Sequence, residues 1–155
     1  MYPGSHAIQN RDKPAFIMAS TGESVTYGEL EQRSNRLAHL LRAQGLQRLD
    51  HYAVFMENNN RFIESCVAGE RTGLYYTCIN SFLTAQEVAY IVNNSESQVM
   101  VTSVSRLSVA REALLACPKV KLCLVVDAGS SLPPSDSHGG LVWRDFAQAL
   151  SDFPT

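Results

Sequence analysis

Residues 67–80 read VAGERTGLYYTCIN, and residues 81–87 continue as SFLTAQE. The first part predicts the end of a helix, because Gly73 stands where a helix C-terminus favours a residue with positive φ. Residues 74–79 are a short run of strand-forming side chains. Thr84 and Glu87 have the spacing of a capping box, in which each side chain satisfies a backbone amide at a helix start. The stretch therefore predicts helix, strand and helix in succession, which is half of a parallel α/β layer.

The same alternation continues on both sides of this stretch. Further strands are expected at residues 51–56, 99–102 and 121–126, and helices at residues 28–44, 61–72, 85–93 and 105–117. Continuous apolar runs predict strands buried on both faces, as in a parallel sheet. Residues 15–18 and 24–27 flank a Thr21-Gly22 turn and predict an antiparallel hairpin. We expect an α/β fold: a mostly parallel, doubly wound, Rossmann-like sheet with helices on both faces and an N-terminal hairpin.

A chain of 155 residues predicts a single domain, residues 1–155. Residues 1–13 are expected to form an N-terminal arm, and residues 14–126 the β/α core. Residues 127–140 are rich in Ser, Pro and Gly and predict a long loop with a turn at Pro133-Pro134. Residues 141–155 are expected to hold a terminal helix, from Trp143 to Leu150, and a tail.

Charge and cysteine content exclude several classes of protein. A net charge of −2 gives no electrostatic footprint for nucleic acid. No apolar run approaches the ~18–20 residues of a transmembrane segment. The four cysteines form no C-x-x-C pair and lie in apolar contexts, which favours buried reduced thiols over zinc or disulfides. They are Cys66, Cys78, Cys117 and Cys123. Reduced thiols in turn predict a cytoplasmic protein.

Three segments resemble the N-terminal part of the AMP-forming acyl-CoA synthetases, the adenylate-forming ligases that activate fatty acids. They are residues 25–38, 50–59 and 75–92, of which the last is the most specific. The resemblance covers residues 15–126 and is strongest to the bacterial fatty-acyl members. Leu49 departs from it, because the family usually has Gly in that position, and a Leu there should stiffen the turn.

The resemblance implies a two-step reaction for the parent enzyme, with ATP, Mg²⁺ and coenzyme A as cofactors. A fatty acid attacks ATP to give an acyl-adenylate, and coenzyme A then takes the acyl group. The chain would be the scaffold subdomain of this larger synthetase fold, truncated before the family's phosphate loop, and its partner would be the rest of the synthetase. The Ser/Thr/Gly-rich phosphate loop ending in Pro-Lys-Gly is absent from the sequence. We therefore assign no catalytic, cofactor-binding or metal-binding residue, and expect the chain alone to be inactive and to bind no cofactor.

Asn80 is the candidate substrate-binding residue. Ligands of open parallel sheets bind beyond the carboxyl ends of the strands, where residues 57–59, 80–81, 102–103 and 127 fall. An amide both donates and accepts hydrogen bonds, and Asn80 lies where the resemblance is strongest. The alternative is that Asn80 fixes its own loop through backbone hydrogen bonds. Glu57 and Asp127 are a conceivable acid pair, but nothing in the sequence brings them together.

Two other functions fit the same pattern. The first is a non-catalytic interaction or structural module derived from the family. The second is an unrelated Rossmann-like ligand-binding domain. A synthetase scaffold, catalytic or not, should expose sheet edges or apolar faces that the rest of the synthetase normally covers. We expect self-association or a large apolar patch near residues 74–83 or 120–126.

Overall fold

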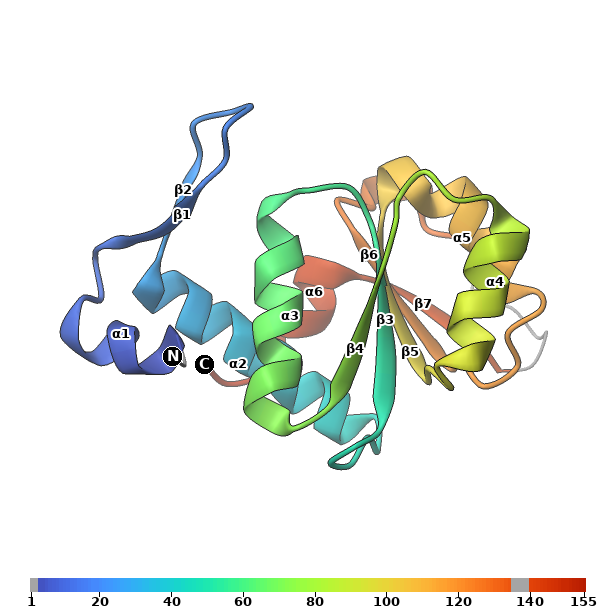
Figure 1. Cartoon of the computed structure of the whole chain (residues 1–155), viewed down its shortest axis with the longest axis horizontal. Helices are drawn as coiled ribbons and strands as arrows, with labels where there is room; N and C mark the ends of the chain where they lie inside the picture. The colour runs from blue at the N-terminus through green and yellow to red at the C-terminus, as the bar shows by residue number, and fades with distance from the viewer. Residues whose placement is uncertain (1–2, 135–139) are drawn as a thin grey trace.

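A five-stranded parallel sheet forms the centre of the structure, a computed structural model that describes residues 3–134 and 140–155 (Figure 1). The strand order is β4-β3-β5-β6-β7. In chain order the strands are β3 (His51–Phe55), β4 (Tyr75–Ile79), β5 (Val99–Ser103), β6 (Leu122–Val126) and β7 (Val142–Asp145). Every neighbouring pair is parallel. The predicted doubly wound α/β fold is confirmed.

Helices cover both faces of the sheet (Figure 1). One face carries α2 (Tyr27–Ala43), α3 (Asn60–Thr72) and α6 (Phe146–Ser151), and the other carries α4 (Ala85–Asn94) and α5 (Leu107–Leu114). Side chains of β3 alternate between the two cores: Tyr52 and Val54 pack in the first, Ala53 and Phe55 in the second. Because both faces are covered, residues 52–55 of this strand are all buried, as the apolar run after His51 predicted.

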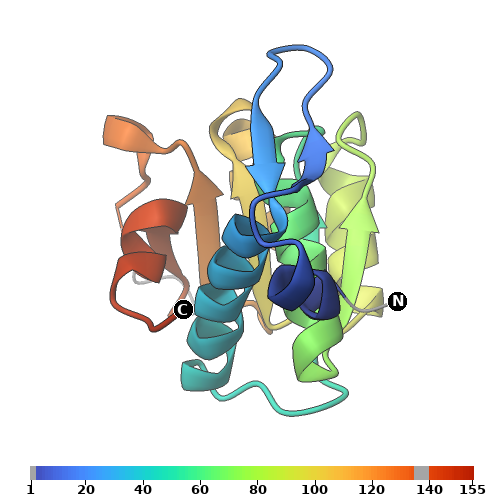
Figure 2. The same cartoon turned by 90° about the vertical axis from the view of Figure 1, so that its left-hand side faces the viewer.

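An antiparallel hairpin of β1 (Pro14–Ile17) and β2 (Ser24–Thr26) extends from the start of α2 (Figure 2). The expected N-terminal arm also contains a helix, α1 (Pro3–Gln9), which packs against α2. The His6 and Tyr27 rings stack there with centroids 5.0 Å apart. Seven residues are too few for a stable isolated helix, so α1 depends on this packing, which the sequence pattern does not display.

The local signals at the helix ends behave as predicted. Thr26 with Glu29, and Thr84 with Glu87, both form capping boxes. Gly73 ends α3 in the left-handed conformation, at φ 70°. Leu49 lies in a turn at φ 77°, where a glycine is usually preferred. The turn thus keeps a glycine-like backbone although it carries a leucine.

The C-terminal part corrects the start of the expected last helix and excludes one of the two places named for an apolar patch. Residues 142–145 form strand β7, so the last helix begins at Phe146 and not at Trp143. Pairing with β6 decides this, because the register sets Cys123 against Trp143. Residues 120–126 form no exposed apolar patch, since all except Lys121 are buried between the two layers of helices. Residues 135–139 of the expected loop at 127–140 lie outside the described residues.

Candidate functional site

A cleft of about 550 Å³ lies at the carboxyl ends of β3 and β4. Its lining joins the loop after β3, the first turn of α3, the loop after β4 and the turn that follows β5. The lining residues are Met56, Glu57, Asn58, Phe62, Cys78, Ile79, Asn80, Ser81, Phe82 and Arg106. The cleft therefore presents both apolar and polar side chains at the rim where open parallel sheets bind their ligands.

Glu57 connects the ends of β3 and β5 at this rim. The chain leaves β3 toward α3 on one face and leaves β5 toward α5 on the other, so the strand order changes direction here. The Ser103 and Ser105 hydroxyls both donate to Glu57 Oε2 at 2.5 Å. Burial opposes the ionisation of Glu57, but the hydrogen bonds from these two serines together lower the pKa of its carboxyl. Glu57 is thus a carboxylate held in place by its neighbours.

Arg106 supplies the positive charge of the cleft. Its guanidinium carbon lies 5.6 Å from the centre of the Phe82 ring, within the range of a cation–π contact. Its Nε atom is buried and has no hydrogen-bond partner among the described residues. No other Arg or Lys is found in the described lining of the cleft. Sequence reasoning missed Arg106, because only the neighbouring positions of β3, β4 and β5 bring the turn after β5 to this place.

Asn80 lies in the cleft, and its side chain also holds its own loop. Its Oδ1 accepts a hydrogen bond from the Phe82 backbone N–H at 3.0 Å. Its backbone carbonyl accepts another from the Leu83 N–H at 3.2 Å. The Asn80 Oδ1 therefore fixes its own loop, as the alternative hypothesis proposed. The Nδ2 group takes no part in that bond and belongs to an exposed side chain. Asp127, the other acidic candidate, follows β6 and is absent from the described lining of the cleft.

The cysteines differ from the expectation that all four are buried. Cys117 and Cys123 are buried, whereas Cys66 is half-buried and Cys78 is exposed at the cleft. The Sγ atoms of Cys66 and Cys78 lie 3.8 Å apart. Sequence reasoning did not predict this pair, because twelve positions separate the two residues and they belong to different elements.

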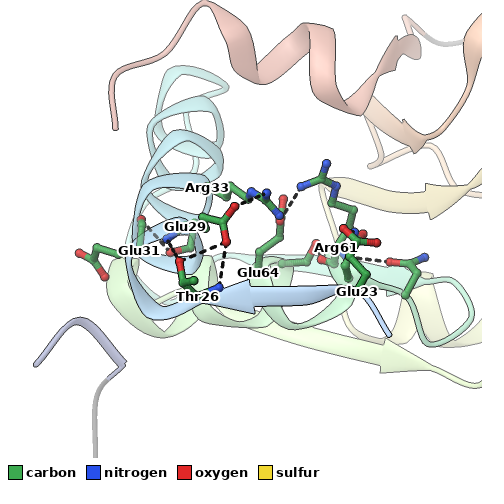
Figure 3. A network of polar contacts seen from close by, with 11 residues as sticks. Glu23, Thr26, Glu29, Glu31, Arg33, Arg61 and Glu64 are labelled. Carbon is green, nitrogen blue, oxygen red and sulfur yellow. Dashed lines mark hydrogen bonds and ion pairs between the residues drawn. The ribbon is translucent and has the colours of Figure 1, made fainter. Parts of the chain in front are cut away.

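A polar network fastens α3, whose first turn borders the cleft, to α2 and the hairpin (Figure 3). Arg61 pairs with the buried Glu64 at 3.0 Å, and Arg33 pairs with Glu29 at 3.2 Å. Burial raises the pKa of Glu64, and the Arg61 charge opposes that shift. The Asn60 amide donates to Glu23 of the hairpin at 2.5 Å. Arg33 Nη1 and Glu64 Oε1 are buried without a hydrogen-bond partner among the described residues. The contacts that are made join α3 to α2 and to the hairpin, so we interpret the network as structural.

The described part of the chain shows neither a cluster of metal-ligating side chains nor a membrane-spanning helix. No group of three or more His, Cys, Asp or Glu side chains there is arranged to hold a metal ion. Among the helices formed by residues 3–134 and 140–155, none is long and apolar enough to cross a membrane.

The sequence matches the family described as AMP-binding enzyme over residues 5–149. It is 31% identical over 127 residues to the 3-oxocholest-4-en-26-oate–CoA ligase of Rhodococcus rhodochrous, an alignment that covers 82% of this chain and 23% of the relative. It is 29% identical over 126 residues to a medium/long-chain-fatty-acid–CoA/3-oxocholest-4-en-26-oate–CoA ligase of Mycolicibacterium smegmatis, covering 81% of this chain and 22% of the relative.

The fold is similar to that of a putative long-chain-fatty-acid CoA ligase from Rhodopseudomonas palustris CGA009. The TM-score is 0.80 at 22% identity, and the match covers 99% of this chain and 36% of that one. At this identity the likeness concerns the fold. The chain thus spans about a quarter of the length of the curated relatives that it matches.

Proposed function

The chain belongs to the AMP-binding enzyme family of AMP-forming CoA ligases, and from this premise we propose that it is the N-terminal scaffold of an ATP-dependent fatty-acyl-CoA ligase. The proposed overall reaction joins a fatty acid to coenzyme A through an acyl-adenylate. In it, residues 1–155 supply the sheet and one wall of the substrate cleft. The similarity to ligases named for fatty acids supports the choice of substrate.

The chemistry of the cleft carries this proposal. A fatty acid has a carboxylate head and an apolar chain, and the cleft offers a surface for each. The Arg106 guanidinium and the Asn80 amide provide donors for a carboxylate. The side chains of Phe62, Ile79 and Phe82 provide an apolar wall for the first carbons of the chain. We assign Asn80 and Arg106 to the acid substrate.

The proposed adenylation step needs more positive charge than this wall contains. Phosphoryl chemistry depends on several cations, backbone amides and Mg²⁺ placed around the phosphates. The described lining of the cleft contributes one arginine, and Glu57 adds a negative charge beside it. The chain alone is therefore expected neither to bind ATP tightly nor to make acyl-CoA. Family members use ATP and coenzyme A, and the rest of the ligase is the proposed source of the phosphate-binding groups.

Thermal unfolding of the 155-residue chain with each ligand separately tests the assignment. Decanoate at 100 times its Kd should stabilise the fold by ~2.7 kcal/mol and raise the midpoint by roughly 5–10 °C. ATP with Mg²⁺, or coenzyme A, should leave the midpoint unchanged. Arg106→Gln and Asn80→Ala should each reduce the shift with decanoate, whereas Arg111→Gln, on α5 outside the cleft, should keep it.

Two outcomes would contradict the proposal. A chain that makes decanoyl-CoA from decanoate, ATP and coenzyme A is a complete catalyst and not a scaffold. A decanoate shift that survives Arg106→Gln but disappears in Arg111→Gln would place the acid at another site.

A second candidate function, the non-catalytic interaction module, is favoured by the edge strand β4. Its outer edge pairs with no strand among the described residues, and Tyr75 and Phe82 beside it are 56% and 84% exposed. An unpaired edge with exposed aromatic side chains is a template for association with another strand. Sedimentation of the chain alone distinguishes the two: the module predicts a dimer that Tyr75→Lys disrupts, with no effect of decanoate.

A further inference from the structure

Two thiols from different elements face each other beside the cleft. Cys66 lies in α3 and Cys78 in the edge strand β4, and their Sγ atoms are 3.8 Å apart. Cys78 is opposite Val54 of β3 in the parallel register, on the face of the sheet that α3 covers. A disulfide bond requires the two sulfur atoms to approach from this distance to about 2.05 Å.

Gly69 explains why α3 approaches β4 so closely. A Cβ atom at this position would lie 2.6 Å from Tyr76 Cδ1 and 2.7 Å from the Tyr52 hydroxyl oxygen. The absence of a side chain therefore allows the helix to lie directly on the two rings. Cys66 precedes Gly69 by three residues and so shares its face of the helix. The same close approach places Cys66 against Cys78.

The two thiols have unequal environments, which gives them different roles. Either thiol can donate in the contact between the two sulfur atoms, but Cys78 is exposed and Cys66 is half-buried. The hydrogen bond with Cys66 lowers the pKa of Cys78 to about 7. The same bond, followed by burial, raises the pKa of Cys66. The other ionisable groups that face the pair are Glu70 on α3, Tyr76 on β4 and Tyr52 on β3. Glu70 and the two tyrosines are either neutral or negatively charged, so none of them attracts a thiolate. The hydrogen bond from Cys66 is therefore the contact that stabilises the Cys78 thiolate.

We propose that Cys66 and Cys78 are a peroxide-sensitive thiol pair that closes reversibly into an intrachain disulfide. The exposed Cys78 thiolate attacks one oxygen of hydrogen peroxide, so that an S–O bond forms, the O–O bond breaks and hydroxide leaves. Cys66 then attacks the sulfenic sulfur of Cys78, so that the S–S bond forms, the S–O bond breaks and hydroxide leaves. The two thiol protons convert both hydroxides to water, and the two thiols supply the two electrons that reduce the peroxide.

Disulfide formation would act on the cleft as well as on the fold. The bond links α3 to the edge strand β4 within the segment 66–78, and Cys78 is part of the cleft lining two residues before Asn80. Oxidation would draw the Cys78 side chain toward α3 and fix this wall. The proposal goes beyond the fatty-acyl ligase function, and its test does not depend on that function.

The test is oxidation of the reduced chain with equimolar hydrogen peroxide, followed by thiol counting and peptide mass mapping. The free thiols should fall from four to two, with a mass loss of about 2 Da and a single Cys66–Cys78 cross-linked peptide. A dithiol reductant should restore all four thiols. Cys117→Ala, which alters a buried thiol whose pKa burial raises to about 11, should behave as wild type.

Single substitutions separate the two roles. Cys66→Ser should stop the reaction at a Cys78 sulfenic acid, which dimedone captures, and Cys78→Ser should lose at least tenfold in the rate of oxidation. We expect both variants to fold, because Cys78 is exposed and Cys66 is only half-buried. Far-UV circular dichroism checks this. Four thiols remaining in the treated wild type, or a cross-link between two chains or to Cys117 or Cys123, would overturn the proposal.

Discussion

Substitution of Gly69 by alanine should destabilise the chain although alanine is the better helix former. The added Cβ would meet Tyr76 Cδ1 at 2.6 Å and the Tyr52 hydroxyl at 2.7 Å. Tyr52 is fully buried and its hydroxyl donates to the Ser65 carbonyl, so the ring has no free direction in which to move. Overpacking of this kind costs about 3 kcal/mol at the upper end of its usual range. The higher helix propensity of alanine offsets about 1 kcal/mol of this cost.

The net loss of about 2 kcal/mol corresponds to a fall of roughly 4–8 °C in the unfolding midpoint of a chain of this size. Thermal and urea unfolding followed by far-UV circular dichroism measure it. A second substitution, Tyr76→Leu, removes one of the two clashing rings, so Gly69→Ala should cost less in the Tyr76→Leu background than in the wild type. An alanine variant as stable as wild type would refute the argument that Gly69 sets the distance between α3 and the sheet.

Three other predictions concern the turn before β3, the cleft and a helix cap. Leu49→Gly should be more stable than Leu49→Ala by about 0.5–1 kcal/mol in urea unfolding, because glycine relieves the left-handed strain at the cost of some chain entropy. Equal stabilities would show that the turn is unstrained. The pKa of Glu57 is lowered from its ordinary 4.5, so its stabilisation is present above pH 4.5 and is lost as the pH falls through the folded-state value. The difference in midpoint between wild type and Glu57→Gln should therefore shrink below about pH 4.5, and a constant difference would contradict this. Thr84→Ala should cost about 1 kcal/mol through loss of the capping box of α4, and Thr84→Ser, which keeps the hydroxyl, clearly less.

Sequence reasoning succeeded where the decisive interactions are local. Gly73, the two capping boxes and the apolar run of β3 each involve residues within a few positions of one another. It failed where distant partners decide the outcome. Strand β7 exists because β6 lies beside it, and α1 exists because α2 does.

The candidate site divides in the same way. Asn80 was proposed from its place after a strand that was expected to be buried, but β4 is an edge strand with Tyr75 and Cys78 exposed. The structure adds that the Asn80 Oδ1 is occupied by its own loop. Arg106 and the Cys66–Cys78 pair escaped notice, since each depends on which strands are neighbours in the sheet. A positive charge in the first turn after a buried strand was the signal available for Arg106. That signal points to the cleft only when the order of the strands in the sheet is known.

The most direct test of the central claim, that the cleft beyond β3 and β4 holds the acid substrate, is a titration of the ¹⁵N-labelled chain with decanoate, followed by NMR. The chain also contains an apolar cavity of about 360 Å³ near Leu115 and Trp143, which offers the acid a competing site. Our account predicts that the shifted amides cluster at residues 56–58, 78–82 and 106, and that Arg106→Gln reduces their shifts. Shifts confined to the surroundings of Leu115 and Trp143, or no saturable shifts at all, would contradict it.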